Sequence, residues 1–557
     1  MKALKPILIS DFTINNLSGY LTNLADTVRY SPVIAPFNQV QQVLLNPNLE
    51  CWKSTPDFAI VFCQPQKVIH SFNKLLNNEA ITLDIILNEV DEFIQQLISC
   101  SSRVKFTLLA SFTLDANKYY GISAYHLTNG VAYTLAQINN RLAQKLTQAN
   151  GFYLLDAQRW INSAGANAYP PKLWYLSKIP FHNTVFECAA NDINACVKTI
   201  LGLTKKLIVL DLDDTLWGGI VGDAGWQHLI LGGHNALGEA YVDFQKTLLA
   251  IANTGVQLAI VSKNEELVAL TAIEKHPEMI LRKNNFVAHK INWKDKAQNI
   301  YDLTTELNIG LDTVVFMDDN PAERARVKEA LPQVFVPQMP NDKLLFPSFL
   351  QTLNCFATSI ISNEDVNRTQ YYNDEKNRSQ SKLTFQSIDE WLATIDIKIN
   401  AEPLNTKNSS RITQLFNKTN QLNLSTRRLT EKEITEFTAQ STNSIWAFSL
   451  TDKFGDAGLT GILGLTFKNN IAHITDFILS CRVMGRKCEE TMLAFAITLA
   501  KQNKCNTLVA EYIPSPKNKP CLSFFITSGL VQTNNTFIWD LNTEYTLPPY
   551  INFTNVH

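Results

Sequence analysis

The sequence predicts an α/β protein with several domains. Apolar segments of strand length alternate with amphipathic helical segments, which is typical of domains built on a largely parallel sheet. Several apolar segments in the middle of the chain end in acidic or hydroxyl residues, as strands of an open α/β sheet do at a ligand site. The chain has 557 residues, too many for one hydrophobic core, so two to four domains are expected.

The composition favours a globular protein without a nucleic-acid or membrane partner. The sequence is 45% hydrophobic and 18% charged, and 49 Lys and Arg residues against 51 Asp and Glu give a net charge of −2. Its ten cysteines contain no Cys-x-x-Cys pair, so we expect no zinc site and a reduced, cytoplasmic setting. No apolar run approaches the ~18–20 residues of a membrane span, and the N-terminus does not have the pattern of a signal peptide.

Residues 1–200 predict a first α/β domain that serves as a scaffold. Strands are expected at 6–10, 57–62 and 104–109, and helices at 83–98 and 131–148. Ser10 follows the first strand, where hydrolases of the SGNH type carry their nucleophile, so the region resembles an SGNH domain. Its Gly-Asp-Ser and late Asp-x-x-His motifs are missing, and His182 is the only late candidate base. We therefore predict a domain without its catalytic set.

A paired-carboxylate motif follows the apolar run Leu207–Leu210, which has the length and branching of a buried parallel strand. Asp211 and Asp213 come directly after it and point to the same side of an extended chain, roughly 6–7 Å apart. Two carboxylates that close disfavour each other's ionisation unless a cation lies between them. A hard divalent ion such as Mg²⁺ is the natural partner, so the motif predicts metal-assisted phosphate chemistry with a carboxylate nucleophile.

Three further polar positions extend this motif. Ser262 follows the strand expected at 256–261, Lys296 opens a helix, and Asp318 with Asp319 follows the strand expected at 313–317. Each is weak evidence alone, because a strand-end serine is often a turn or cap residue and a single lysine is usually solvated. The ordered set of Asp-x-Asp-x-Thr, Ser, Lys and Asp-Asp is specific, and it predicts one phosphate site in residues 201–360.

This order of motifs resembles the haloacid dehalogenase (HAD) superfamily of phosphotransferases. The resemblance implies that Asp211 is the nucleophile and that Asp213 is the general acid and base. It also implies that Asp318, with Asp319 as a possible further ligand, holds Mg²⁺ together with Asp211 and the backbone carbonyl of Asp213.

The same resemblance assigns the phosphate-binding side chains. Thr215 and Ser262 would bind the phosphoryl oxygens, and Lys296 would offset the charge of nucleophile and phosphate. The insert between Asp213 and Ser262 is short for a large cap domain, so the site should admit a bulky substrate, including one carried on a protein.

A basic loop in the C-terminal region suggests a second site. Residues 361–395 predict a linker with a docking helix, and residues 396–557 predict another α/β domain. Within it, a strand is followed by Arg482, Gly485, Arg486 and Lys487 and then by a helix, an arrangement that can cradle a phosphate. The loop resembles the pyrophosphate loop of GNAT-type acyltransferases, although Lys487 stands where that loop usually has Gly or Ala. A solvated basic helix start is the alternative.

Cys481 lies beside this loop and is a candidate nucleophile. A free cysteine is usually a buried small hydrophobic residue. Here a helix N-terminus and two arginines should favour the thiolate, which would let Cys481 carry an acyl group. His473 and Asp476 are conceivable partners, and a structural role is the alternative for both.

The combination of these regions resembles the FkbH-like family of glyceryltransferase/phosphatases. The phrases KTNQLNLSTRR (418–428), DKFGDAGLTG (452–461) and FMDDNPAER (316–324) carry the resemblance together with the HAD motifs and SCRVMGR. It implies a reaction in which phosphate is removed from 1,3-bisphosphoglycerate and a glyceryl thioester is loaded onto the phosphopantetheine arm of an acyl carrier protein, for polyketide-type biosynthesis.

Two other functions stay open on the sequence. The protein could be a stand-alone Mg²⁺-dependent HAD phosphatase for a small phosphorylated metabolite, with an accessory C-terminal region. It could also be a binding or scaffolding subunit with decayed sites, which the complete set of Asp211, Asp213, Ser262, Lys296 and Asp318 argues against. The pathway product, the carrier and the oligomeric state are not encoded in recognisable motifs.

Overall fold

A computed structural model gives the fold of the chain. It describes residues 3–555 except 116–117, 119, 129, 234, 359–377, 379–380, 383–384 and 386. Most of the expected linker at 361–386 therefore lies outside the described residues, whereas the expected docking helix is present as α19 (Ile388–Ala393). The structure is α/β throughout, which confirms the predicted fold class.

The chain forms two compact units. Unit 1 comprises Met1–Lys198 and Leu429–Glu436, and unit 2 comprises Thr199–Arg428 and Phe437–His557. The described residues contain no helix long and apolar enough to cross a membrane.

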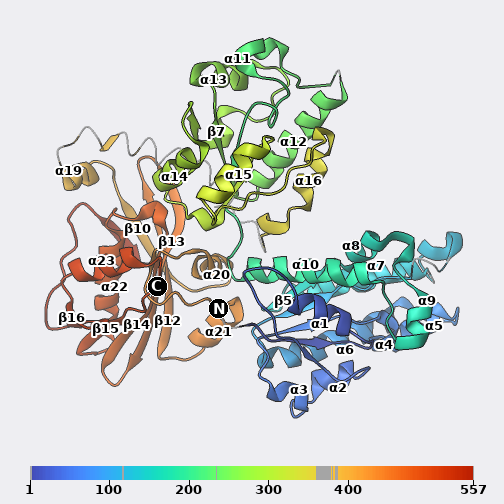
Figure 1. Cartoon of the computed structure of the whole chain (residues 1–557). Helices are drawn as coiled ribbons and strands as arrows, with labels where there is room; N and C mark the ends of the chain where they lie inside the picture. Colours follow the sequence, from blue (N-terminus) through green and yellow to red (C-terminus); the bar gives the residue numbers. More distant parts are fainter. Residues whose placement is uncertain are drawn as a thin grey trace. The chain divides into compact units, whose positions relative to one another are not determined.

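Unit 1 is built on a five-stranded parallel sheet with the order β2-β1-β3-β4-β5. Its strands are β1 (Pro6–Ile9), β2 (Val33–Ile34), β3 (Phe58–Val61), β4 (Thr107–Ala110) and β5 (Phe152–Leu155). Every residue of β1, β3 and β4 is buried, so both faces of the sheet are covered by helices, as for a parallel sheet (Figure 1).

The helices of unit 1 connect these strands (Figure 1). They are α1 (Asn15–Thr22), α2 (Val40–Leu45), α3 (Glu50–Lys53), α4 (Pro65–Val68), α5 (His70–Leu76), α6 (Leu83–Cys100), α7 (Val131–Leu146), α8 (Ala157–Ala164), α9 (Pro171–Ser177) and α10 (Asn183–Ile200). The sequence predicted the long α6 and α7 because their apolar residues recur at helical spacing, and these residues are buried in the core of the unit.

The first part of unit 2 has a four-stranded parallel sheet with the order β8-β7-β6-β9. Its strands are β6 (Leu207–Leu210), β7 (Gln257–Ser262), β8 (Phe286–Ile291) and β9 (Val314–Met317). Its helices are α11 (Val221–Ala224), α12 (Ala236–Ala252), α13 (Glu266–Lys275), α14 (Lys296–Glu306), α15 (Pro321–Ala330) and α16 (Phe346–Thr352). Alternate residues of β6 pack on opposite faces, Ile208 and Leu210 in one core and Leu207 and Val209 in the other.

The second part of unit 2 is a nine-stranded mixed sheet with the order β16-β17-β15-β14-β13-β12-β10-β18, and β11 pairs with β14. Its strands are β10 (Lys398–Pro403), β11 (Leu422–Asn423), β12 (Asn443–Asp452), β13 (Gly455–Lys468), β14 (Ile471–Leu479), β15 (Thr507–Glu511), β16 (Val531–Thr533), β17 (Thr536–Asp540) and β18 (Asn552–Asn555). The helices are α20 (Ser409–Lys418), α22 (Cys488–Gln502) and α23 (Lys519–Thr527), whereas most of α21 (Glu431–Thr438) belongs to unit 1. Helix α22 packs on β13, β14 and β15.

Candidate active site

The predicted acidic motif lies at the carboxyl edge of the four-stranded sheet. Asp211 follows β6, which lies between β7 and β9, and the Asp211 backbone N–H donates to Met317 at the end of β9. Lys296 Nζ lies 3.0 Å from Asp211 and 2.6 Å from Asp318, and all three side chains are at least nine-tenths buried. One ammonium group therefore sits between the carboxylates of Asp211 and Asp318.

Burial dominates the electrostatics of this cluster. It raises the pKa of Asp211 to about 7, because Lys296 only partly offsets the desolvation and the Asp318 charge adds to it. Burial also raises the pKa of Asp318, against the opposing effect of Lys296. Burial would lower the pKa of Lys296, but the two carboxylates outweigh it and the pKa is raised. The site thus holds Lys296 charged and carries more carboxylates than cations.

The donors present fit a divalent cation. Carboxylate oxygens of Asp211, Asp318 and Asp319 all lie within 4.8 Å of one another. Asp211 Oδ1 is buried and accepts no well-directed hydrogen bond, although Lys296 Nζ is close enough for an ion pair. A buried carboxylate oxygen that accepts no hydrogen bond and lies near two further carboxylates can act as a metal ligand. Such a group of oxygen atoms matches the coordination that Mg²⁺ takes in proteins.

The Asp213 carboxylate is held apart from that group by three N–H donors. Trp217 Nε1 donates over 2.8 Å and the Val221 backbone N–H over 3.1 Å to Oδ1, while Asn264 Nδ2 donates over 2.8 Å to Oδ2. These bonds fix the orientation of the carboxylate. An orientation fixed independently of the metal ligands suits the acid–base role that the family resemblance implied, and it leaves only the backbone carbonyl for the metal.

The two predicted phosphate-binding hydroxyls lie beside the carboxylates. Ser262 is the last residue of β7, and its hydroxyl lowers the pKa of Asp211 against the larger effect of burial. Thr215 is fully buried, and its Oγ1 accepts from the Asp319 backbone N–H over 3.0 Å. In the structure Thr215 therefore positions Asp319, and a phosphate contact by either hydroxyl stays a prediction.

A second cavity, of about 290 Å³, contains the exposed side chain of Cys481. Cys481 follows β14 in a short 3₁₀ turn, and Arg482 lines the same cavity. The other cationic side chains lining it are Lys206, Arg411, Lys418 and Lys517, and the only acidic one among the described lining residues is Asp312, which pairs with Lys517 at 2.7 Å. The cavity is therefore strongly positive, which suits a phosphorylated substrate.

The loop after Arg482 differs from the expected phosphate cradle. Arg486 is buried and pairs with Asp452 over 3.1 Å, so it does not face an anion from solvent. The Gly485 N–H donates over 2.9 Å to the buried carboxylate of Glu489, and Lys487 pairs with Glu490. The loop's donors are thus used inside the protein, and the expectation that both arginines face a ligand is wrong for Arg486.

Comparison with known proteins places the N-terminal region in a family. Residues 18–198 match the model described as "FkbH, N-terminal domain". Residues 18–198 are therefore similar to the N-terminal domain of FkbH. The match confirms the resemblance drawn from the sequence, and it falls in the region whose motifs were the least specific. No curated protein matches this chain.

Solved structures also resemble parts of this chain. The N-terminal part of protein BF1531 from Bacteroides fragilis, described as containing a phosphatase domain complexed with Mg, has 26% identity and a TM-score of 0.58. The alignment covers 64% of this chain and 95% of that one. A GNAT-family acetyltransferase from Staphylococcus aureus has 13% identity over 26% of this chain and 99% of its own, with a TM-score of 0.20. We draw no functional conclusion from this second likeness.

The structure adds residues to the site that the sequence did not predict or predicted only weakly. Lys343 Nζ lies 2.8 Å from Asp214 and 3.4 Å from Asp319, at the edge of the carboxylate group. It comes from a turn before α16 that carries no motif. Asn264 had a sequence signal, because it stands two residues after Ser262 at the same strand tip.

The hydrolase residues of the N-terminal domain do not form a site. Ser10 is buried, and its Oγ accepts the Phe12 N–H over 3.1 Å within a turn. His182 Nδ1 contacts Thr184, and no hydrogen bond joins Ser10 to His182 in the described part of the domain.

Asp476 is fully buried and bound by Arg427, so it is not a free partner for Cys481.

Proposed function

We propose that the protein is an Mg²⁺-dependent phosphatase coupled to a glyceryl transferase. It would remove phosphate from the three-carbon unit of 1,3-bisphosphoglycerate and load glyceryl as a thioester onto an acyl carrier protein for polyketide-type biosynthesis. The observation that supports the phosphatase half is the buried cluster of Asp211, Lys296 and Asp318 at a strand edge, in a chain similar to a phosphatase-domain protein solved with Mg.

The phosphatase half follows from the positions of the two catalytic carboxylates. An oxygen of Asp211 attacks phosphorus, and the bond from phosphorus to the glyceryl oxygen breaks as Asp213 gives that oxygen a proton. Asp213 then takes a proton from water, which attacks the aspartyl phosphate and releases inorganic phosphate. Asp211, Asp318 and Asp319 would hold Mg²⁺, which when bound supplies positive charge against the phosphoryl oxygens.

The transfer half rests on Cys481 in its positive cavity. The thiolate attacks the carbonyl carbon of the acyl phosphate, a carbon–sulfur bond forms, and the carbon–oxygen bond to phosphate breaks. The sulfur of the carrier's pantetheine thiol then attacks the enzyme thioester and loses its proton to solvent. The new carbon–sulfur bond forms as the bond to the Cys481 sulfur breaks, and Cys481 leaves as a thiolate. Arg482 and the lysines of the cavity would bind the phosphate that leaves.

The residues proposed for the two half-reactions lie at opposite ends of the strands of one sheet. Lys206, which precedes β6, and Gln257, which opens β7, line the Cys481 cavity, whereas Asp211 follows β6 at the other edge. Five residue steps along the strand separate Lys206 from Asp211, or about 16 Å at 3.3 Å per residue. An acyl group bound to Cys481 cannot therefore reach Asp211 across the sheet. This geometry favours a mobile carrier arm that takes the acyl group from one edge to the other.

Mass spectrometry of the carrier tests the proposal. The protein is incubated with 1,3-bisphosphoglycerate, Mg²⁺ and a holo carrier protein, and the carrier should gain a glyceryl group. With Asp211→Asn the carrier should gain a phosphoglyceryl group instead, and with Cys481→Ala it should gain nothing. Cys188→Ala, which removes a thiol in unit 1, is the matched control and should behave like the parent. Acylation that persists in Cys481→Ala would exclude Cys481 as the carrier of the acyl group.

A stand-alone phosphatase is the second candidate. It is favoured by the loop geometry, because Gly485 and Arg486 are engaged inside the protein and offer no pyrophosphate cradle. Phosphate release from free 3-phosphoglycerate at the same rate with and without carrier, together with an unmodified carrier, would establish this function in place of the first.

A further inference from the structure

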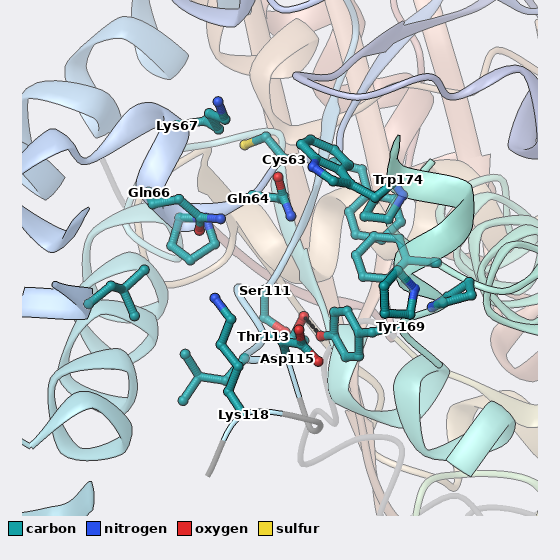
Figure 2. A pocket seen from close by; sticks show the side chains of 18 of the residues that line it. Cys63, Gln64, Gln66, Lys67, Ser111, Thr113, Asp115, Lys118, Tyr169 and Trp174 are labelled. Carbon is teal, nitrogen blue, oxygen red and sulfur yellow. Dashed lines mark hydrogen bonds between the residues drawn. The ribbon is translucent and has the colours of Figure 1, made fainter. Parts of the chain in front are cut away.

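Unit 1 contains a cavity of about 330 Å³ that the proposed reaction does not use (Figure 2). Gln64 and Ser111, which line it, follow β3 and β4 near the carboxyl ends of those parallel strands. This edge is where open α/β sheets bind ligands, and the volume falls within the range of small-molecule sites. The position and size of the cavity therefore point to a ligand.

One wall of this cavity is aromatic. Phe62 and Phe181 stack with ring centroids 5.1 Å apart and an 8° angle between the rings, and Tyr169 meets Phe181 edge-on. Trp174 on α9 is different, because among the described residues its ring has only the Lys178 ammonium, 5.2 Å from the centroid, as a partner. Figure 2 shows the Trp174 ring on the same side of the cavity as Tyr169. An aromatic face without a ring partner is available to stack on a flat ligand.

The facing wall is polar and has unused hydrogen-bonding capacity. Gln64 Oε1 is buried without a hydrogen-bond partner. Ser111 Oγ accepts from the Ala157 N–H over 3.0 Å, and its own hydroxyl proton has no described acceptor. The Lys118 ammonium turns into the cavity, and no described carboxylate lies within ion-pair distance of it (Figure 2). Gln64 Oε1 can accept a hydrogen bond from a ligand, and the Ser111 hydroxyl and the exposed Lys118 ammonium can bind a negative group of the same ligand.

The two side chains of this region with the clearest precedent as nucleophiles are not set up for a reaction. Ser10 is buried outside its lining and engaged in a turn. Cys63 lines the cavity, but burial raises the pKa of its thiol well above the usual value, which disfavours the reactive thiolate. The chemistry that remains is binding.

We propose that this cavity binds a small ligand that joins a flat aromatic ring to a single anionic group, either a phosphate or a carboxylate. The ring lies against Trp174 and Tyr169, and the anion pairs with Lys118. Asp115, also in the lining, makes a second anionic group unfavourable because it would be repelled. The proposal is independent of the proposed transferase reaction, since it uses none of the residues placed in that reaction.

Calorimetric titration of the full chain tests this site. The protein carries Asp211→Asn and is kept in EDTA, so that the phosphatase site neither turns over a phosphate ester nor holds a metal. The probes are 1-naphthyl phosphate and 2-naphthoate, with neutral naphthalenemethanol and inorganic phosphate as probes that lack one of the two features. We expect saturable binding of at least one aryl anion, at least about tenfold tighter than either single-feature probe.

Variants locate the binding. Trp174→Ala and Lys118→Met should each weaken the aryl anion at least about tenfold. Lys172→Met, an exposed lysine of α9 outside the cavity lining, should leave the affinity unchanged. The tighter of the two aryl anions identifies the head group. The site would be overturned if neither aryl anion binds, or if the Trp174 and Lys118 variants bind the aryl anion as tightly as the parent protein does. The need for an anionic group would be overturned if the neutral naphthalenemethanol binds as tightly as the aryl anions.

Discussion

Asp11→Asn should remove a large part of the pH dependence of the stability of unit 1. Asp11 is 2% exposed, its Oδ1 accepts the Gln64 N–H over 2.7 Å, and its Oδ2 is buried without a partner. Burial raises the pKa of Asp11 from 3.8 to about 6. The folded protein therefore holds this proton more tightly than the unfolded chain does, so the free energy of unfolding falls as pH rises between these two values.

The size of the effect follows from the shift. A difference of about 2.2 pKa units at 1.36 kcal/mol per unit corresponds to about 3 kcal/mol, present below pH 4 and lost by pH 6–7. Asparagine keeps the oxygen that accepts from Gln64 but cannot ionise. The stability of Asp11→Asn relative to the parent should therefore increase by up to about 3 kcal/mol between pH 4 and pH 7.

Hydrogen exchange of the β1 and β3 amides is the appropriate assay, because it reports on unit 1 within the intact chain. Protection is measured from pH 4 to pH 7 and corrected for the intrinsic exchange rate at each pH. Asp84→Asn, which removes an exposed carboxylate from the start of α6 in the same unit, is the control and should follow the parent. A parent and an Asp11→Asn variant whose protection changes equally with pH would refute the reasoning.

Three further predictions concern unit 2. Lys296→Met leaves two buried carboxylates without their cation. The free energy of unfolding of the metal-free protein at pH 7, measured by urea titration, should therefore fall by about 3–5 kcal/mol. An unchanged midpoint of the urea unfolding curve would contradict the pairing. Asn264→Leu removes a donor to Asp213 and should lower kcat for phosphate release about tenfold with KM unchanged, whereas a change confined to KM would argue for a binding role. Arg482→Gln should raise KM for carrier acylation about tenfold and leave hydrolysis of free phosphoglycerate unaltered; equal losses in both assays would indicate misfolding.

The candidate phosphatase site could be predicted because most of its polar side chains lie at the carboxyl ends of strands. Asp211, Ser262 and Asp318 each end or follow a short apolar run, and parallel strands bring such ends to one edge. Lys296 is the first residue of α14, and its Nζ lies 2.6 Å from Asp318 at that edge. Local sequence patterns were sufficient here because the sheet topology itself assembles the site.

Lys343 could not be found in this way. It lies in a turn after a stretch without regular structure, and it reaches Asp214 and Asp319 because the turn and α16 pack on α12. No periodicity or spacing encodes such a contact. Loop residues that complete a site through tertiary packing are therefore invisible to reasoning from motifs alone.

The C-terminal loop shows a different limit. Its pattern of arginines and glycine before a helix is the same whether the arginine meets a phosphate or an internal carboxylate. The partner of Arg486 that decides this is Asp452, 34 residues away on β12. The Gly485 N–H donates to the carboxylate of Glu489, in the first turn of α22. A buried acid that satisfies the loop removes its affinity for an external anion. Only the fold distinguishes these outcomes.

The sheet between the two proposed sites of unit 2 also constrains how they can be coupled. The residues that begin β6 and β7 face the Cys481 cavity, and the residues that end them face the carboxylate cluster, so no side chain of these strands can contact both ligands. In the reaction proposed above, the acyl group would therefore not pass directly between side chains of the two sites, and it would have to move while attached to a carrier. The proposed phosphoglyceryl group on a flexible carrier arm would satisfy this requirement, because the arm that accepts the acyl group at one edge could then present its phosphate at the other.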